Sequence, residues 1–205
     1  MEQPITFPVG NITLEGLLSG PPRPAGIGVV VCHPHPLRGG EMGNNIVTAL
    51  VDGFRAAGMA TLRFNFRGVG KSGGSHDDGR GELDDVTAAV TCLLGHHAVS
   101  TVVVAGYSFG SIVGLAAGAR DPRVHKLIGV ALPIANRDAS FLHSVTKPTL
   151  LISGDHDDFS PAAKLRQLVA ACPASQSLCM IDGADHFFWG VEQRVAEAAV
   201  AFLAE

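Results

Sequence analysis

Charged residues, and lysine above all, are scarce in this sequence, and several segments that mark other classes of protein are missing. Charged residues make up 17% of the 205 residues and hydrophobic residues 46%, a balance that excludes extended disorder. No apolar run approaches the roughly 18 residues needed to span a bilayer. The 15 basic residues include only four lysines and form no cluster, so no surface for nucleic acid or an anionic membrane is predicted.

The cysteines and the first residues also carry little signal. The four cysteines stand far apart without any C-x-x-C pair; they are Cys32, Cys92, Cys172 and Cys179. Such a pattern is typical of reduced thiols rather than of a disulfide framework. The first residues lack the basic and apolar regions of a secretory signal. We therefore expect a cytoplasmic protein.

The chain length predicts one domain. A chain of 21.3 kDa buries about 70% of its surface on folding, which suffices for one substantial core. The net charge is −4 and the mean hydropathy +0.26. We expect a single domain over residues 1–205, because no linker or internal repeat divides the chain.

Glycine, in contrast, is abundant. The 25 glycines amount to about 12% of the chain, against about 7% on average. They follow neither a collagen period nor a low-complexity tract, but fall in short groups between apolar runs. This placement predicts tight turns at the ends of strands.

The apolar pattern predicts an α/β fold. An alternating pair of segments, 5–9 and 12–18, is joined by Gly10 and Asn11 and predicts a β-hairpin. Further strands are predicted at 27–32, 59–66, 100–105, 127–132, 149–153 and 178–181. Helices are predicted at 46–57, 82–94, directly after 106–110, at 161–171 and at 191–205, with Gly58 and Gly95 as helix ends and Ser160 as an N-cap. This alternation indicates a mostly parallel sheet of about eight strands with an antiparallel edge hairpin.

One motif between a strand and a helix carries nucleophile chemistry. Residues 106–110 read Gly-Tyr-Ser-Phe-Gly, the G-x-S-x-G pattern of a nucleophile elbow, in the strand–helix context that such an elbow requires. A glycine-rich chain can produce the pattern by chance, but this context argues against chance. Ser108 would stand at a helix N-terminus, where the helix dipole favours developing negative charge.

A nucleophilic serine needs a base and an acid, and two later loops offer them. The acid-rich loop 154–161 follows the strand 149–153, and His186 follows the last strand. The carboxyl ends of parallel strands meet at one edge of a sheet, so both loops should open beside Ser108. A lone loop histidine is most often an ordinary surface residue, but this position predicts that His186 is the base.

Several motifs together resemble those of the α/β-hydrolase superfamily. They lie at residues 33–40 (HPHPLRGG), 64–72 (FNFRGVGKS), 106–110, 154–161 and 183–186. The sequence is most similar to small cap-less serine hydrolases of the dienelactone-hydrolase-like group, and the resemblance covers nearly the whole chain. It implies a single-domain α/β-hydrolase fold with helices on both faces of the sheet and no cap domain.

The resemblance also assigns roles to acidic and backbone groups. It implies that Asp157 is the acid, because this residue lies three positions after a strand-end glycine and four before a proline. Asp155 and Asp158 are neighbouring alternatives. An oxyanion hole would be formed by the backbone N–H of Phe109 and a second N–H after the strand 27–32.

Two prolines narrow the choice of that second donor. Pro34 and Pro36 have no N–H to offer, which leaves His35 or Leu37, and we favour His35. The pair His33-x-His35 also has a spacing compatible with zinc. The prolines suit an oxyanion loop better, so we expect no metal and no cofactor.

The function expected from this resemblance is hydrolysis of carboxylic esters or thioesters through a Ser-His-Asp triad. A serine departs from dienelactone hydrolases proper, which carry a cysteine there, and from dehalogenases, which carry an aspartate. A peptidase or amidase, or a non-catalytic binding protein on the same fold, is the alternative. The expected partner is a small-molecule ester or thioester, with neither nucleic acid nor membrane.

The short interval 132–147 leaves no room for a lid and predicts an open, shallow pocket. Candidates for its lining are Leu37, Met42, Tyr107, Phe159, Phe187 and Phe188, each of which could equally be ordinary packing. Arg63 and Arg67 are expected to make structural hydrogen bonds, with binding of an anionic substrate as the alternative. The acidic residues at 77–78 and 82–85 are expected on a solvated face and at a helix N-terminus.

Overall fold

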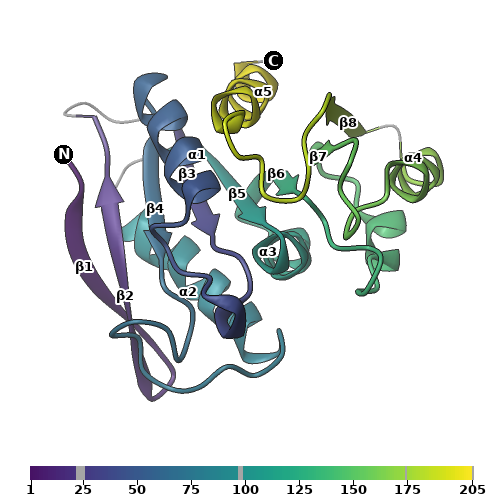
Figure 1. Ribbon diagram of the computed structural model, residues 1–205. Helices are drawn as coiled ribbons and strands as arrows, with labels where there is room; N and C mark the ends of the chain where they lie inside the picture. The colour runs from purple at the N-terminus through teal and green to yellow at the C-terminus, as the bar shows by residue number, and fades with distance from the viewer. Residues whose placement is uncertain (22–25, 97–98, 174, 205) are drawn as a thin grey trace.

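A computed structural model describes residues 1–21, 26–96, 99–173 and 175–204 (Figure 1). Within these ranges, eight strands form one sheet in the order β1-β2-β4-β3-β5-β6-β7-β8. Their bounds are β1 Gln3–Val9, β2 Ile12–Ser19, β3 Ile27–Cys32, β4 Ala60–Phe64, β5 Thr101–Tyr107, β6 Val124–Val130, β7 Thr149–Gly154 and β8 Gln176–Ile181. The hairpin β1–β2 joins β4 antiparallel and all other neighbours pair parallel, which confirms the predicted sheet.

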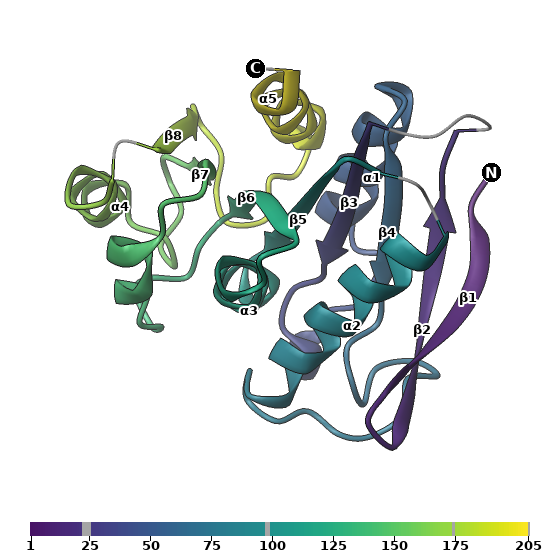
Figure 2. The same cartoon turned by 180° about the vertical axis from the view of Figure 1, so that it is seen from behind.

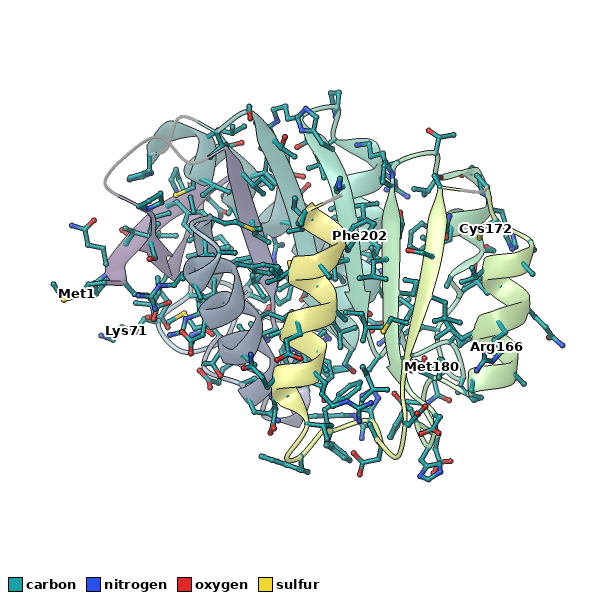
Figure 3. All side chains as sticks on the ribbon, turned by 90° about the horizontal axis from the view of Figure 1, so that it is seen from above. Met1, Lys71, Arg166, Cys172, Met180 and Phe202 are labelled. Atoms are coloured by element: carbon teal, nitrogen blue, oxygen red, sulfur yellow. The ribbon has the colours of Figure 1, made fainter. Side chains whose placement is uncertain are left out.

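Helices cover both faces of the sheet, as Figures 1 and 2 show from opposite sides. The helices α1 (Asn45–Ala56) and α5 (Glu192–Ala204) lie together on one face. Figure 3 shows α5, with Phe202 labelled, lying over the strands of the sheet and beside α1. The other face is covered by α2 (Gly81–His96), α3 (Phe109–Arg120) and α4 (Ala162–Ala170).

The central strands are buried on both faces. In β3, Val29 and Val31 pack toward α1 and α5, whereas Val30 and Cys32 pack toward α2 and α3. All four side chains have no exposed surface. This two-sided burial explains why the strand reads as a continuous apolar run rather than an alternating one.

Several predicted boundaries are wrong. Gly95 does not end α2, which continues to His96, because a glycine on an exposed helical turn weakens a helix without stopping it. Ser160 is not the N-cap of α4: Pro161, with ψ of 123°, takes that position and the helix begins at Ala162. The strand β6 begins three residues earlier than predicted. Glu205, the predicted end of the last helix, lies outside the described residues.

The connection between β6 and β7 is short and carries one 3-10 turn, η2 (Ser140–Ser144). It inserts no domain over the sheet edge, so the predicted absence of a cap is confirmed. At one end of the sheet, β1 pairs with β2 alone and contains Pro4 and Pro8.

Two negative findings apply to the part of the chain that the structure describes. None of its helices has the length and apolar character needed to cross a membrane. Its four cysteines are all free thiols, with Cys32 and Cys92 buried.

Candidate active site

Ser108 stands in a sharp turn between β5 and α3. Its backbone has φ of 53° and ψ of −118°, a left-handed conformation that a non-glycine residue adopts only under local constraint. A Cβ on Gly106 would overlap the carbonyl of Gly110, and a Cβ on Gly110 would overlap the carbonyl of Cys32. The two glycines are therefore required because strand, turn and helix approach one another within backbone contact.

The structure brings Ser108, His186 and Asp157 into one hydrogen-bonded line. Ser108 Oγ lies 3.0 Å from His186 Nε2, and His186 Nδ1 lies 2.9 Å and 3.0 Å from the two carboxylate oxygens of Asp157. A carboxylate can only accept, so Nδ1 carries the proton and Nε2 is free to accept from the serine hydroxyl. Asp157 and His186 are 3% and 8% exposed, so water hardly screens this pair.

Backbone groups orient Asp157. Its Oδ1 accepts hydrogen bonds from the N–H groups of Phe159, at 2.9 Å, and Ser160, at 3.0 Å. Asp155 instead accepts from the N–H of Gly183 at 2.7 Å, while Asp158 is exposed. Of the three neighbouring carboxylates, Asp157 is the one that contacts His186.

Aromatic side chains surround His186. The Tyr107 hydroxyl donates a hydrogen bond of 2.8 Å to the His186 carbonyl, and burial raises the pKa of Tyr107, so it remains a donor. The rings of Phe159 and Phe187 lie 4.6 Å and 5.6 Å from the imidazole, centroid to centroid. The imidazole is thus held on one side by a carboxylate and flanked by apolar rings.

The turn after β3 presents backbone groups to the same region. The carbonyl of His35 accepts from the N–H groups of Arg38 and Gly40, both at 3.0 Å, which curls the chain into the 3-10 turn η1 (Pro36–Arg38). The Leu37 N–H is engaged with His35 Nδ1 at 3.3 Å. Among the described residues, the backbone N–H groups of His35 and Phe109 donate to no protein acceptor.

The buried side chain of His33 holds this turn in place by two hydrogen bonds to the backbone. Its Nε2 accepts from the Phe66 N–H at 3.0 Å, which leaves Nδ1 to donate to the Pro34 carbonyl at 2.7 Å. Burial lowers the pKa of His33 to about 4, so the ring is neutral. Both nitrogens of His33 are occupied by backbone, which leaves no free nitrogen to share an ion with His35. No cluster of three or more His, Cys, Asp or Glu suited to a metal occurs in the described ranges.

A pocket of about 630 Å³ opens over Ser108. Of the predicted lining side chains, Tyr107, Phe159 and Phe187 line it. The other three do not.

Each of these three side chains has a different surrounding. Leu37 is 75% exposed, and Phe188 is wholly buried in the core beneath α1 and α5. Met42 is half-buried, and its backbone is tied by hydrogen bonds to Asn65 and Arg63. Phe187 and Phe188 are equally apolar, so the sequence does not show which of the two lines the pocket and which one is buried in the core.

The pocket lining also includes polar residues that were not predicted there from the sequence. They are Arg38, Asn44, Asp78, Asn136 and Arg137. The position of Arg38 within the motif 33–40, which follows a strand end, could have indicated that it lies near the site. Arg137 carries a weaker signal, since it follows β6, the neighbour of β5, at the same sheet edge.

The other arginines and acidic residues near the glycine-rich loop are structural. Arg63 pairs with Glu2, with N–O distances of 2.8 Å and 2.6 Å, and Arg67 pairs with Asp85 at 2.7 Å. Asp78 and Asp84 are exposed, and Glu82 lies in the first turn of α2, as expected. Glu82 and Asp85 are fully buried, so the expected solvated face is wrong for these two residues. Glu82 accepts from backbone N–H groups before α2, at 2.9 Å each, and so closes the helix N-terminus.

Comparisons with known proteins agree with this fold. A serine hydrolase homologue from Coxiella burnetii superposes with a TM-score of 0.90 at 32% identity, covering 98% of this chain and 97% of its own. The protein XC6422 from Xanthomonas campestris, a serine hydrolase without lid, superposes with a TM-score of 0.88 at 30% identity, covering 99% and 94%. The uncharacterized protein RP471 of Rickettsia prowazekii is 34% identical over 194 residues, which are 88% of this chain and 79% of that protein.

The family comparison covers most of the chain. A sequence model described as "Alpha/beta hydrolase domain" matches residues 29–199. Together with the two serine hydrolase structures, this match supports hydrolase activity in general. The chain belongs to the α/β-hydrolase family.

Proposed function

We propose that the protein is a serine hydrolase that cleaves carboxylic esters, or thioesters, of small to medium acyl groups. The observation that carries the proposal is the line from Ser108 Oγ through His186 to Asp157, with contacts of 3.0 Å and 2.9 Å. Such a line lets a neutral hydroxyl lose its proton as it attacks. The open pocket over Ser108 gives an ester direct access to it.

In the first step, Ser108 Oγ forms a bond to the carbonyl carbon and its proton passes to His186 Nε2. Asp157 stabilises the resulting imidazolium through Nδ1–H. The carbonyl oxygen becomes an oxyanion, and the unpaired backbone N–H groups of His35 and Phe109 donate to it. One donor of this kind contributes about 10²–10³ in rate.

In the second step, the bond to the leaving group breaks and His186 returns the proton to the departing oxygen or sulfur. A water molecule then gives a proton to His186 and attacks the acyl carbon. The bond to Ser108 breaks, and the proton on Nε2 restores the serine hydroxyl. The cycle consumes one water and needs no metal or cofactor.

The first test is labelling with a fluorophosphonate probe, which reacts with activated serines. The native protein should be labelled at Ser108, Ser108→Ala should not be labelled, and His186→Ala should be labelled far more slowly. Well-folded native protein that resists the probe would refute the proposal and favour a non-catalytic binding protein.

The second test is a panel of esters, acyl thioesters and aminoacyl amides compared by kcat/KM. Esters or thioesters should exceed amides of the same acyl group. If amides are cleaved faster than esters, the protein is a peptidase or amidase that uses the same proton transfers.

A further inference from the structure

Two arginines follow the strands on either side of β5. Arg38 lies in the turn after β3 and Arg137 in the segment after β6, and both strands are neighbours of β5, which carries Ser108. Both side chains line the same pocket as Ser108. The sheet order therefore brings both arginines to the sheet edge that carries the proposed nucleophile.

The charges in the pocket do not cancel. Arg137 Nη2 lies 2.8 Å from Asp78 Oδ1, and Asp78 is the one carboxylate that lines the pocket within the described ranges. Arg38 is exposed and forms no ion pair with any described residue. The residues that line the pocket thus include two arginines and one aspartate, although the chain as a whole has a net charge of −4.

The cations lie close to the proposed oxyanion hole. The Arg137 guanidinium lies 5.9 Å from the centre of the Phe109 ring. The His35 ring lies 5.0 Å from the same ring. Partial burial, aided by the charges of His76, Arg137 and Arg38, lowers the pKa of His35. Both arginines therefore lie near the part of the pocket lining that His35 and Phe109 form.

The pocket lining next to His186 is apolar. There the rings of Phe159 and Phe187 flank His186. Because His186 must hand its proton to the leaving group, the leaving group lies along these rings. An acyl group that extends away from His186 can then reach the part of the lining that contains His35, Arg38 and Arg137.

Resting on the proposed function, we propose that the substrate is an ester or thioester whose acyl group ends in a carboxylate, bound by Arg38 and Arg137. A planar guanidinium matches the two oxygens of a carboxylate. Arg38, the lining arginine without an ion pair among the described residues, balances one carboxylate, whereas a phosphate monoester carries between about −1.5 and −2. Arg38 is the main specificity-determining residue, because the guanidinium of Arg137 is already paired with Asp78.

The experiment compares three 4-nitrophenyl esters of equal acyl length that differ at the far end. Hexanoate ends in a methyl group, hemiadipate in a carboxylate and 6-aminohexanoate in an ammonium group. The native protein should show kcat/KM about tenfold higher for hemiadipate than for hexanoate, with 6-aminohexanoate lowest. The preference should shrink as ionic strength rises, because salt screens exposed charges.

Two variants test the pocket charge in opposite directions. Arg38→Gln should lower the ratio of kcat/KM for hemiadipate over hexanoate by about tenfold. Asp78→Asn should raise the same ratio several-fold, since it removes the one negative charge, and asparagine tolerates the positive φ of 50° at this position. Arg166→Gln is the matched control, because Arg166 is an exposed arginine on α4 outside the pocket (Figure 3).

Hydrolysis of hexanoate and probe labelling at Ser108 report on the proposed function separately. If both occur but hemiadipate has no advantage over hexanoate, the carboxylate proposal fails while the hydrolase proposal stands. A ratio that Arg38→Gln leaves unchanged, or that Arg166→Gln lowers equally, also refutes it. A carboxylate placed on the leaving group of a hexanoate ester should bring no advantage; if it does, the charged end is not on the acyl group.

Discussion

The hydroxyl of Tyr107 donates a hydrogen bond of 2.8 Å to the backbone carbonyl of His186. Tyr107 directly precedes Ser108, so this bond joins the turn of the proposed nucleophile to the loop of the proposed base. The tyrosine side chain is almost fully buried, so water cannot replace it. The position of His186 relative to Ser108 thus depends on a contact between the end of β5 and a loop that lies 79 residues later in the sequence.

Tyr107→Phe should therefore lower kcat about five- to tenfold with little change in KM. The variant removes the hydroxyl but keeps the ring, so packing is retained while the His186 loop loses its tether. The buried carbonyl also loses its partner, which should lower the free energy of unfolding by about 1–2 kcal/mol. Steady-state kinetics on a neutral ester and urea unfolding measure both effects. An unchanged kcat would show that the imidazole is positioned without this bond.

Three conservative substitutions distinguish the neighbouring carboxylates. Asp157→Asn should lower kcat by about 10³–10⁴, because an amide at this position favours the wrong imidazole tautomer. Asp155→Asn and Asp158→Asn should stay within about threefold of the native rate, since neither side chain contacts His186. Rates of probe labelling and of ester hydrolysis should rank the three variants alike. A large loss in Asp158→Asn together with a small loss in Asp157→Asn would contradict the assigned acid.

The buried His33 predicts an acid-sensitive contribution to stability. Its pKa is about 4 in the folded protein, against about 6.5 when unfolded. Between about pH 6.5 and pH 4, His33 is protonated in the unfolded chain but neutral in the folded protein. The free energy of unfolding therefore falls as the pH falls, and this loss levels off below about pH 4. Between pH 7.5 and 4.5 this group should remove about 2–3 kcal/mol of unfolding free energy.

The comparison of His33→Gln with native protein isolates this contribution. The variant should be less stable at pH 7.5, because it weakens the hydrogen bonds that join the His33 side chain to the backbone of Phe66 and Pro34. Its stability should depend less steeply on pH. His143→Gln, at an exposed histidine, should keep the native pH dependence. Urea unfolding over the pH range provides the measurement, and equal slopes in native protein and His33→Gln would exclude a neutral buried imidazole.

Two glycine substitutions should have effects of opposite sign. Gly106→Ala should destabilise the protein by about 3 kcal/mol or more, because its Cβ overlaps the backbone of Gly110. Gly95→Ala should stabilise it by about 0.5–1 kcal/mol, because this glycine lies in α2 and, outside the adjoining helical backbone, no described residue has an atom within 4 Å of an added Cβ. Thermal or urea unfolding tests both. A stabilising Gly106→Ala would mean that the elbow is looser than described.

Much of the fold could be predicted because its signals are local. The strand 27–32 is a short β-branched run, and the predicted bounds are those observed for β3. The residues 106–110 combine a strand end, two glycines and a helix start, so the turn around Ser108 follows from backbone sterics. Parallel topology then places the loops of Asp157 and His186 at the same edge of the sheet. The distance of 2.9 Å between His186 Nδ1 and Asp157 Oδ2 agrees with this placement.

The parts that could not be predicted depend on which way a side chain faces. Phe187 lines the pocket and Phe188 is buried, although both are equally apolar. Glu82 and Asp85 are buried because hydrogen-bond partners satisfy them, and no periodic pattern in the sequence marks these partners. Glu82 accepts from N–H groups three and five residues before it, and Asp85 pairs with Arg67, 18 residues before it. Asp78 and Arg137 meet across 59 residues, a pairing that no local pattern encodes.

The proline pair in β1 has a consequence for how molecules of this protein meet one another. A strand at the rim of a sheet offers unpaired N–H and C=O groups to any similar strand from another molecule, which is a common start of fibril growth. Pro4 and Pro8 have no N–H group, so a neighbouring strand would lack donors at two of the seven positions of β1. The hairpin therefore resists continuous strand addition, and the protein should tolerate high concentration without extending its sheet from molecule to molecule at this edge.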